Sequence, residues 1–508
     1  MEERIRKAVN EALKKMGAGE IAFVVERPSE FTHGDYATNA ALAAAKALGK
    51  KPHEVADELA RFLIDALGKD IASHVAVAGP GFVNITLARE AVTLAVAEAD
   101  AQDAEWGRPA SSEQRAASRV MIEYSNLNAF KEMHIGHLVG TVVGEAVSRL
   151  IENSGAKVAR DTFGGDIGPN VAKALWGLRK NGVNEPTTAS EIGAAYTEGS
   201  NAYESDPKAK DEIDALNQAI YAGTDRELME LWRKGRDVSM EEFRRIWKLL
   251  GTRFDFEFFD SDTTETGVRV VHDGLAKGIF EMSDGAIIYN GEGKSVHTMV
   301  FITSHDTPTY EAKDIGLAFL KEERWPSDKV IIVTGNEQTG RFKTILAALT
   351  DIAPLLAAKT THLATGFLKL ASGKMSSREG NIITAVGFIQ DVILKASEKN
   401  TDPLIAEQVA LGAIKYMILR QAPGSDIIFD TEKSLSLEGD SGPYLQYALV
   451  RAKSVLDKSD LSKKVSADNS APTEPARIER IILHFPEVAA RAARELAPNL
   501  LVNYLTEL

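Results

Sequence analysis

The sequence contains no cysteine among its 508 residues. This absence excludes a disulfide framework and any zinc site built on thiolates. The sequence also lacks a run of about 18–20 consecutive apolar residues, which a membrane-spanning helix requires. Its first 17 residues place Ile5, Val9, Leu13 and Met16 at helical spacing among charged residues. They predict an amphipathic helix and not a signal peptide, because no continuous apolar core is present. We therefore expect a cytoplasmic protein without a membrane partner.

Positive charge is in deficit, because the formal net charge is −14. Affinity for phosphates comes mainly from Lys and Arg, so this balance argues against broad nucleic-acid binding and we expect no DNA partner. It does not exclude a local basic groove, since net charge is a sum and binding is local. The other fractions, 44% hydrophobic and 26% charged residues, are typical of a folded globular protein. The length suggests about three domains.

Three blocks of different pattern follow one another along the chain. We predict an α+β domain over residues 1–110, a Rossmann-like parallel-sheet domain with a helical insertion over residues 118–381, and an α-helical domain over residues 382–508. In the second block, a strand, a helix and a second strand over residues 120–160 form the kind of unit that builds parallel sheets. The last helical pattern stops inside a helix, so we expect the third domain to be truncated.

A histidine pair stands where a loop meets the first helix of the second block. His134 and His137 are three residues apart, so they would share one face of the helix. The N-terminus of a helix offers free N–H groups and the positive end of its dipole. There the imidazoles could donate to phosphate oxygens as these gain charge, and Gly136 would let a flat base approach the backbone. By itself the pattern fits equally well two histidines on an ordinary turn.

A second segment of interest covers residues 373–381, where glycines flank Lys374 and Arg378. A compact ammonium and a guanidinium on a mobile loop suit a triphosphate, whose charge moves as pyrophosphate leaves. Taken alone, this segment is better interpreted as a solvated basic turn.

Together the two segments resemble the HIGH and KMSKS signatures of class I aminoacyl-tRNA synthetases, in their order and their separation. Further segments resemble the arginyl members of that family, at residues 33–39, 123–128, 164–168, 307–314 and 437–447. Because these segments are spread along the sequence, the resemblance runs over nearly the whole chain. It implies an arginine–tRNA ligase that activates L-arginine with ATP, which carries Mg²⁺, and transfers arginine to the 3′ end of tRNA(Arg). It also implies that activation requires tRNA. We expect a monomer, although the sequence does not give the oligomeric state.

The resemblance assigns residues to each substrate. The ATP site would comprise His134, Gly136, His137, Lys374, Met375 and Ser376. The arginine site would comprise Glu123, Ser125, Asn128, Tyr310, Asp314 and Gln338, with Asn128 and Gln338 holding the amino-acid backbone. The chemistry agrees, because a guanidinium prefers carboxylates in a fork geometry and an aromatic ring to stack on. Without the resemblance, Glu123 would be read as a carboxylate facing water at a strand end, and Asp314 as a surface charge on a helix.

One position departs from the family signature. The fourth residue of KMSKS is Ser377 here, followed by Arg378. The resemblance implies that Lys131, three residues before His134, supplies the missing cation, whereas the alternative is a solvated loop lysine. It also implies six contacts with tRNA: Asp35, Tyr36, Asn39, Tyr444, Gln446 and Tyr447. We predict no metal site formed by the protein itself.

Two other functions remain open. The chain could be a class I synthetase for another amino acid, although Glu123 and Asp314 would repel an acidic substrate and the lack of cysteine ligands weakens a cysteinyl or methionyl specificity. It could also be a non-catalytic tRNA-binding paralogue. Such a paralogue would be expected to lose the histidine pair or Lys374, and both are present.

Overall fold

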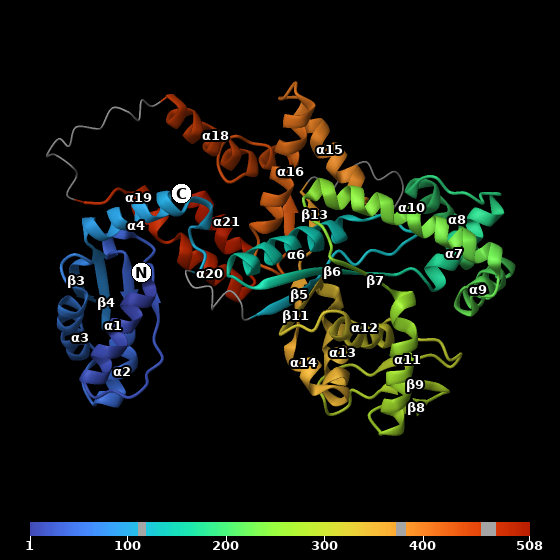
Figure 1. The fold of residues 1–508 in the computed structure, drawn as a ribbon, viewed down its shortest axis with the longest axis horizontal. Helices are drawn as coiled ribbons and strands as arrows, with labels where there is room; N and C mark the ends of the chain where they lie inside the picture. Colours follow the sequence, from blue (N-terminus) through green and yellow to red (C-terminus); the bar gives the residue numbers. More distant parts are fainter. Residues whose placement is uncertain (110–117, 372–382, 459–473) are drawn as a thin grey trace. The chain divides into compact units, whose positions relative to one another are not determined.

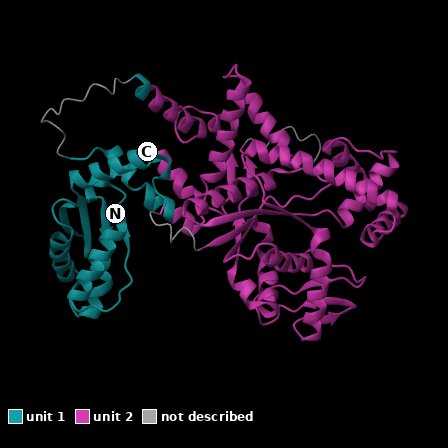
Figure 2. Cartoon of the chain, viewed as in Figure 1, with its two compact units in different colours: residues 1–108, 455–490, 507–508 teal, residues 109–454, 491–506 magenta. Residues whose placement is uncertain are grey.

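The computed structural model describes residues 1–109, 118–371, 383–458 and 474–508. They form two compact units, shown in Figure 2. The first contains residues 1–108, 455–490 and 507–508, and the second contains residues 109–454 and 491–506. The described residues between 455 and 490, which we predicted to belong to the third domain, thus pack with the N-terminal part of the chain. Among the described helices, none has both the length and the apolar character to cross a membrane.

The first unit is built on a four-stranded antiparallel sheet in the order β1-β2-β4-β3. Its strands are β1 (Val25–Glu26), β2 (Tyr36–Thr38), β3 (Ala72–Ala78) and β4 (Phe82–Leu87). Its helices include α1 (Glu2–Lys15), α2 (Ala40–Leu48), α3 (Pro52–Leu67), α4 (Arg89–Gln102) and α19 (Arg477–Leu483). Helix α1 buries Ile5, Val9 and Leu13, the face that its spacing predicts. The α+β prediction for this region is confirmed.

The second unit contains a five-stranded parallel sheet in the order β12-β11-β5-β6-β7 (Figure 1). Its strands are β5 (Arg119–Glu123), β6 (Lys157–Gly164), β7 (Phe256–Phe259), β11 (Lys329–Gly335) and β12 (Thr360–Thr365). Helix α6 (Ile135–Asn153) connects β5 to β6 and packs on the sheet through buried residues such as Leu138 and Val147. The predicted parallel-sheet catalytic fold is confirmed.

Two groups of elements are inserted between the strands of this sheet. Four helices separate β6 from β7: α7 (Pro169–Lys180), α8 (Ala189–Ser205), α9 (Pro207–Ala222) and α10 (Arg226–Leu250). Between β7 and β11 lie α11 (Asp260–Ala276), α12 (Tyr310–Arg324) and a small antiparallel sheet of β8 (Glu281–Ser283), β9 (Ala286–Tyr289) and β10 (Met299–Ile302). Helices α13 (Thr339–Ile352) and α14 (Pro354–Lys359) follow β11. The predicted helical insertion is therefore present and begins with α7.

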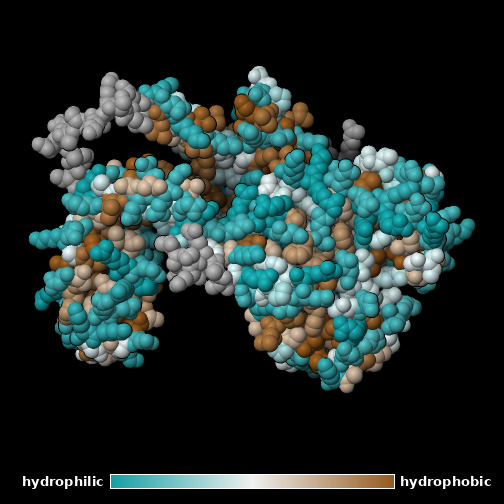
Figure 3. Space-filling model, in the orientation of Figure 1, coloured by the Kyte–Doolittle hydropathy of each residue, from teal (hydrophilic) through white to brown (hydrophobic). Residues whose placement is uncertain are grey.

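The C-terminal part is mainly helical. Its helices are α15 (Ala385–Ser397), α16 (Pro403–Leu419), α17 (Thr431–Ser434), α18 (Gly442–Lys458), α20 (Phe485–Glu495) and α21 (Pro498–Glu507), and β13 (Leu368–Leu370) pairs in parallel with β14 (Ile427–Phe429). Helices α15 and α16 share one core with α6. Helix α18 buries only Gly442 and Pro443, and Figure 3 shows hydrophobic residues on its surface. Leu449 and Val450 are among its exposed side chains.

Candidate active site

The histidine pair lies at the N-terminus of α6. His134 is the N-cap residue, and its Nδ1 accepts a hydrogen bond from the backbone N–H of Gly136 at 3.1 Å. The rings of His134 and His137 stack with their centroids 3.7 Å apart. Burial, together with the neighbouring His134 and Lys131, lowers the pKa of His137 to about 3. The ring is therefore neutral near pH 7, and its buried Nδ1 has no hydrogen-bond partner among the described residues. A polar ligand can supply that partner.

The segment that follows the second motif pairs with the histidine segment. The N–H of Ile135 donates to the carbonyl of Ile383 at 3.2 Å, and the N–H of Ala385 donates to the carbonyl of Met133 at 2.7 Å. His134 itself forms an antiparallel bridge with residue 384. Residues 383–385, which follow the second motif, thus meet the histidine segment through backbone hydrogen bonds. The predicted residues Lys374, Met375, Ser376 and Arg378 lie outside the described residues.

A cavity of about 720 Å³ opens beside the histidines. All of the predicted arginine-site and described ATP-site residues except Glu123 line it: Ser125, Asn128, His134, Gly136, His137, Tyr310, Asp314 and Gln338. They come from the loop after β5, from α6, from α12 and from the turn after β11. The volume is within the usual range for a site that encloses small-molecule substrates.

The loop after β5 is held in an unusual conformation. Ser125 has a φ of 64°, and its Oγ accepts hydrogen bonds from the Thr141 hydroxyl and the Trp247 indole, both at 2.8 Å. Such a left-handed conformation at a residue other than glycine persists only where its surroundings impose it. Further along, Asn128 bridges to Gly165, where an added Cβ would lie 2.1 Å from the Asn128 amide oxygen. A side chain at position 165 would therefore require the Asn128 amide to move.

Asp314 and Tyr310 share one face of α12, as their spacing predicts, and both line the cavity. Burial raises the pKa of Asp314 to about 7; Arg341 opposes this shift, and nearby acidic groups, first Glu123 and then Glu311, add to it. The carboxyl group therefore titrates near neutral pH.

Helix α13 brings Arg341 against these residues, a contact that the sequence reasoning missed. The Arg341 guanidinium forms ion pairs with Asp314 and with Glu311, where the Nε–Oε1 distance is 2.9 Å. Its Nη1 donates to Oε1 of Gln338 at 3.5 Å, and its Cζ lies 5.9 Å from the centroid of the Tyr310 ring. Helical spacing from Gln338 was the available signal, because Arg341 follows it by three residues.

The arrangement does not support the predicted contact between Glu123 and the substrate. Glu123 is 1% exposed. One of its oxygens accepts from Asn126 at 2.6 Å, and the other pairs at 2.5 Å with Lys321, which also pairs with Asp161 at 2.6 Å. The small cavity that Glu123 does line, about 30 Å³, it shares with Asp314. The Glu123 carboxylate thus already pairs with a buried ammonium group, which it shares with Asp161.

Lys131 does not line the main cavity, because it lies against the insertion. Its Nζ is 4.5 Å from the centroid of the Tyr196 ring on α8, a cation–π geometry. It nevertheless lies close to the histidine pair. Burial chiefly, and the Lys131 charge in addition, lower the pKa of both His134 and His137.

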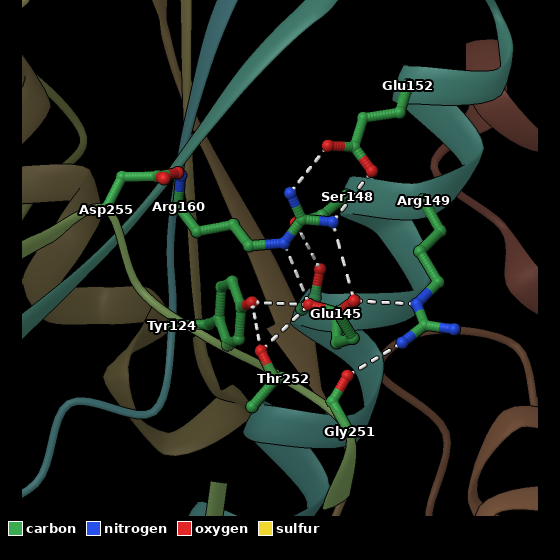
Figure 4. Close-up of polar contacts among 10 residues, drawn as sticks. Tyr124, Glu145, Ser148, Arg149, Glu152, Arg160, Gly251, Thr252 and Asp255 are labelled. Atoms are coloured by element: carbon green, nitrogen blue, oxygen red, sulfur yellow. Dashed lines mark hydrogen bonds and ion pairs between the residues drawn. The ribbon is translucent and has the colours of Figure 1, made fainter. Parts of the chain in front are cut away.

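A polar network holds the second half of α6 in place (Figure 4). Glu145 accepts hydrogen bonds from the hydroxyls of Tyr124 and Thr252, both at 2.8 Å, from Arg160 Nε at 2.9 Å and from Arg149 Nε at 2.6 Å. Burial alone would raise the pKa of Glu145, but the hydrogen bonds, first those from Arg160, lower it. The network ties α6 to β6 and to the turn after α10, and so fixes the helix that presents the histidines.

Comparison with known proteins identifies this arrangement. The family model described as tRNA synthetases class I (R), catalytic domain matches residues 96–431. The chain belongs to the arginyl-tRNA synthetase family. A second model, the arginyl-tRNA synthetase N-terminal domain, matches residues 3–87, and a DALR anticodon binding domain matches residues 445–508.

Individual arginyl-tRNA synthetases resemble the chain over most of its length. The arginine–tRNA ligase of Treponema denticola is 29% identical over 493 residues, which cover 91% of this chain and 82% of the relative. That of Borrelia turicatae is 31% identical over 412 residues, 76% of this chain and 70% of the relative. The structure of the Thermus thermophilus arginyl-tRNA synthetase has a TM-score of 0.77 at 25% identity and covers 100% of this chain and 90% of that one.

Two of the contacts that an arginyl-tRNA synthetase was expected to make with tRNA are buried here. Asp35 and Tyr36 are each 1% exposed. Asp35 accepts from the backbone N–H of Leu87 at 2.7 Å and pairs with Arg480 at 3.2 Å, while the Tyr36 hydroxyl donates to Glu487 at 2.7 Å. These side chains hold the first unit together, and this arrangement does not support direct contact of either one with tRNA.

The other four predicted tRNA contacts differ among themselves. The Asn39 side chain accepts from the backbone N–H of Val24 at 2.8 Å. Gln446 donates to the carbonyl of Gln408 at 3.0 Å and so is engaged with α16. On α18, 38% of Tyr444 and 45% of Tyr447 is exposed. Of these four side chains, the two tyrosines are the exposed ones.

Proposed function

We propose that this chain is an arginine–tRNA ligase, which forms arginyl-adenylate from L-arginine and ATP and transfers the arginine to the 3′ end of tRNA(Arg). The observation that carries the proposal is the cavity of about 720 Å³ in which the histidine pair and the Tyr310–Asp314 face lie together. In a member of this family, such a cavity brings an anion-binding helix terminus to a site for a cation.

The two ends of the cavity bind different substrates, arginine at one end and ATP at the other. The Asp314 carboxylate and the Tyr310 ring bind the guanidinium of the substrate arginine. The side-chain amides of Asn128 and Gln338 bind the amino and carboxylate groups of that arginine. The arginine carboxylate, already ionised, then attacks the α-phosphorus of ATP without a base from the protein. The bond from that phosphorus to the α–β bridging oxygen breaks, and pyrophosphate leaves. His134 and His137, at the N-terminus of α6, donate to phosphate oxygens as charge develops there. The protein thus acts mainly by positioning and by charge stabilisation.

Other features of the reaction belong to the same proposal. Mg²⁺ enters with ATP, coordinated mainly by triphosphate oxygens and water, the usual mode for this small hard cation. Arginine activation requires tRNA, and Tyr444 and Tyr447 contribute to its binding. The enzyme acts as a cytoplasmic monomer without a membrane or DNA partner, and its chain divides functionally near residues 110 and 381.

ATP–pyrophosphate exchange with each amino acid, with and without tRNA, tests the proposal. Arginine should be the one amino acid that supports exchange, and it should do so only when tRNA(Arg) is present. Asp314→Asn should weaken arginine binding by about 2–5 kcal/mol, because one partner of a desolvated charge pair is lost. Asp306→Asn, which changes a carboxylate whose side chain is 80% exposed, is the matched control. Exchange supported by another amino acid, or an arginine affinity of Asp314→Asn within about a factor of two of the parent, would contradict the assignment.

A further inference from the structure

The guanidinium of Arg341 makes the contacts that the proposed function assigns to the guanidinium of the substrate. It pairs with Asp314, lies beside the Tyr310 ring and donates to Gln338, all of which line the cavity. A planar guanidinium is bound best by carboxylates in a fork geometry and by aromatic faces. Arg341 and a free arginine would therefore seek the same partners.

We propose that Arg341 is a built-in competitor of the substrate, an intramolecular guanidinium that closes the arginine site until L-arginine displaces it. The inference rests on the proposed function and adds a regulatory contact to its site. Arg341 lies in the first turn of α13, and 22% of its side chain is exposed. The side chain thus has a path to solvent that leaves the helix in place.

The charges beside the cavity explain why Asp314 and Glu311 need this cation. Two neighbouring buried carboxylates pair with lysines instead: Asp260 pairs with Lys313, and Glu123 pairs with Lys321, which it shares with Asp161. Among the described residues, Arg341 is the cation paired with Asp314 and Glu311. Without it, an empty site would hold two largely desolvated carboxylates with no counter-ion, which is unfavourable. Substrate binding then exchanges one guanidinium for another, and the net charge of the site changes little.

Competition of this kind has a defined effect on affinity. The apparent dissociation constant of a ligand is its intrinsic value divided by the fraction of molecules whose site is open. If Arg341 closes the site in nine molecules out of ten, the apparent affinity for arginine is reduced about tenfold. Removing the competitor should restore that factor.

Calorimetric titration of the full chain with L-arginine measures this change in affinity. Arg341→Gln removes the charge and keeps an amide, while Arg341→Lys keeps a point charge that cannot bridge both carboxylates in a fork. The titration is run at pH 8.5, which favours ionised Asp314 when its counter-charge is absent. Arg341→Gln should bind arginine about tenfold more tightly than the parent, and Arg341→Lys should fall between the two.

A third variant, at Glu311, separates this role from a purely structural one. Glu311→Gln retains the guanidinium but removes one of its two anchors, so it should also tighten arginine binding, by a smaller factor. Damage to the fold would weaken binding instead, and the KM for ATP should stay within about twofold of the parent in both variants. If Arg341→Gln does not fold, Glu311→Gln decides alone.

The outcomes distinguish this inference from the proposed function. In one outcome the parent binds arginine, and Arg341→Gln folds like the parent but binds arginine equally or more weakly. That result overturns the competitor and leaves the ligase assignment standing. If the parent and all three variants fail to bind arginine, the proposed function is overturned, and the competitor with it.

Discussion

At the scale of single residues, Asp314 should make arginine binding depend on pH. Burial raises its pKa to about 7, and a guanidinium needs the ionised carboxylate. Lowering the pH from 8 to 6 protonates Asp314, so arginine affinity should fall about tenfold over that interval, as expected for one group with this pKa. Calorimetry across the interval measures the slope. Asp314→Asn should bind weakly and without the slope, and a flat profile in the parent would show that another group carries the contact.

Lys131 is the second residue whose role can be tested directly. Its ammonium lies on the Tyr196 ring, near both histidines but outside the cavity lining. If it supplies the cation that the second motif lacks, Lys131→Ala should slow adenylate formation about 100-fold, equivalent to roughly 3 kcal/mol. ATP affinity should change less, since the contact strengthens as charge develops. Single-turnover assays with saturating ATP, arginine and tRNA provide the rate.

Three further variants help to interpret that rate. Tyr196→Leu removes the ring that holds the ammonium and should reduce the rate by a smaller factor than Lys131→Ala, while Tyr196→Phe keeps the ring and should stay near the parent. Arg378→Ala tests the rival cation. A parent-like rate for Lys131→Ala combined with a crippled Arg378→Ala would assign the role to Arg378.

At the scale of elements, α7 and α8 approach so closely that two glycines are required. A Cβ added at Gly177 would lie 2.2 Å from the carbonyl oxygen of Ala195, and one at Gly199 would lie 2.1 Å from that of Lys173. Gly177→Ala should therefore destabilise the insertion by about 1–3 kcal/mol, the usual cost of overpacking. Because α8 carries Tyr196, the same change should also lower activity.

Urea unfolding followed by tryptophan fluorescence measures this cost, since Trp176 and Trp232 lie in the insertion. Gly140→Ala in α6 is the matched control for stability, because a Cβ there meets nothing within 4 Å. Alanine is the better helix former, so the control should be neutral or stabilising by up to about 1 kcal/mol. Equal midpoints for the two variants would argue against tight packing of α7 on α8.

What could be predicted from the sequence depended on the range over which each signal acts. The strand–helix–strand unit around α6 is a matter of local periodicity, so the parallel sheet could be predicted. The cavity residues were assigned through the family resemblance, which did not include Arg341. The partners of the buried charges could not be predicted. Lys321 follows Glu123 by 198 residues, and nothing local marks one lysine as its partner. The tRNA assignment of Asp35 failed to anticipate its burial for the same reason, because Arg480 is 445 residues away.

At the scale of the whole molecule, the first unit depends on a segment from the other end of the chain. Arg480 pairs with Asp35, a carboxylate that is 1% exposed. Arg480→Met leaves that charge buried without its cation, so it should destabilise the unit by about 3–5 kcal/mol. Hydrogen exchange in β4, whose Leu87 N–H is bonded to Asp35, measures the loss.

An exposed pair in the same segment is the control. The Arg477 side chain is 70% exposed where it meets Glu507, so Arg477→Met should cost at most about 1 kcal/mol. Similar exchange rates for both variants would mean that the Arg480–Asp35 pair does not hold the unit together.

This construction also sets an order of events during synthesis. At about 5–20 residues per second, a ribosome needs roughly 20–90 s to proceed from Asp35 to Arg480. For that time the N-terminal segment lacks the cation for Asp35 and the Glu487 acceptor for Tyr36 and for the backbone N–H of Glu2. The part of the protein that is made first is therefore among the last to be completed.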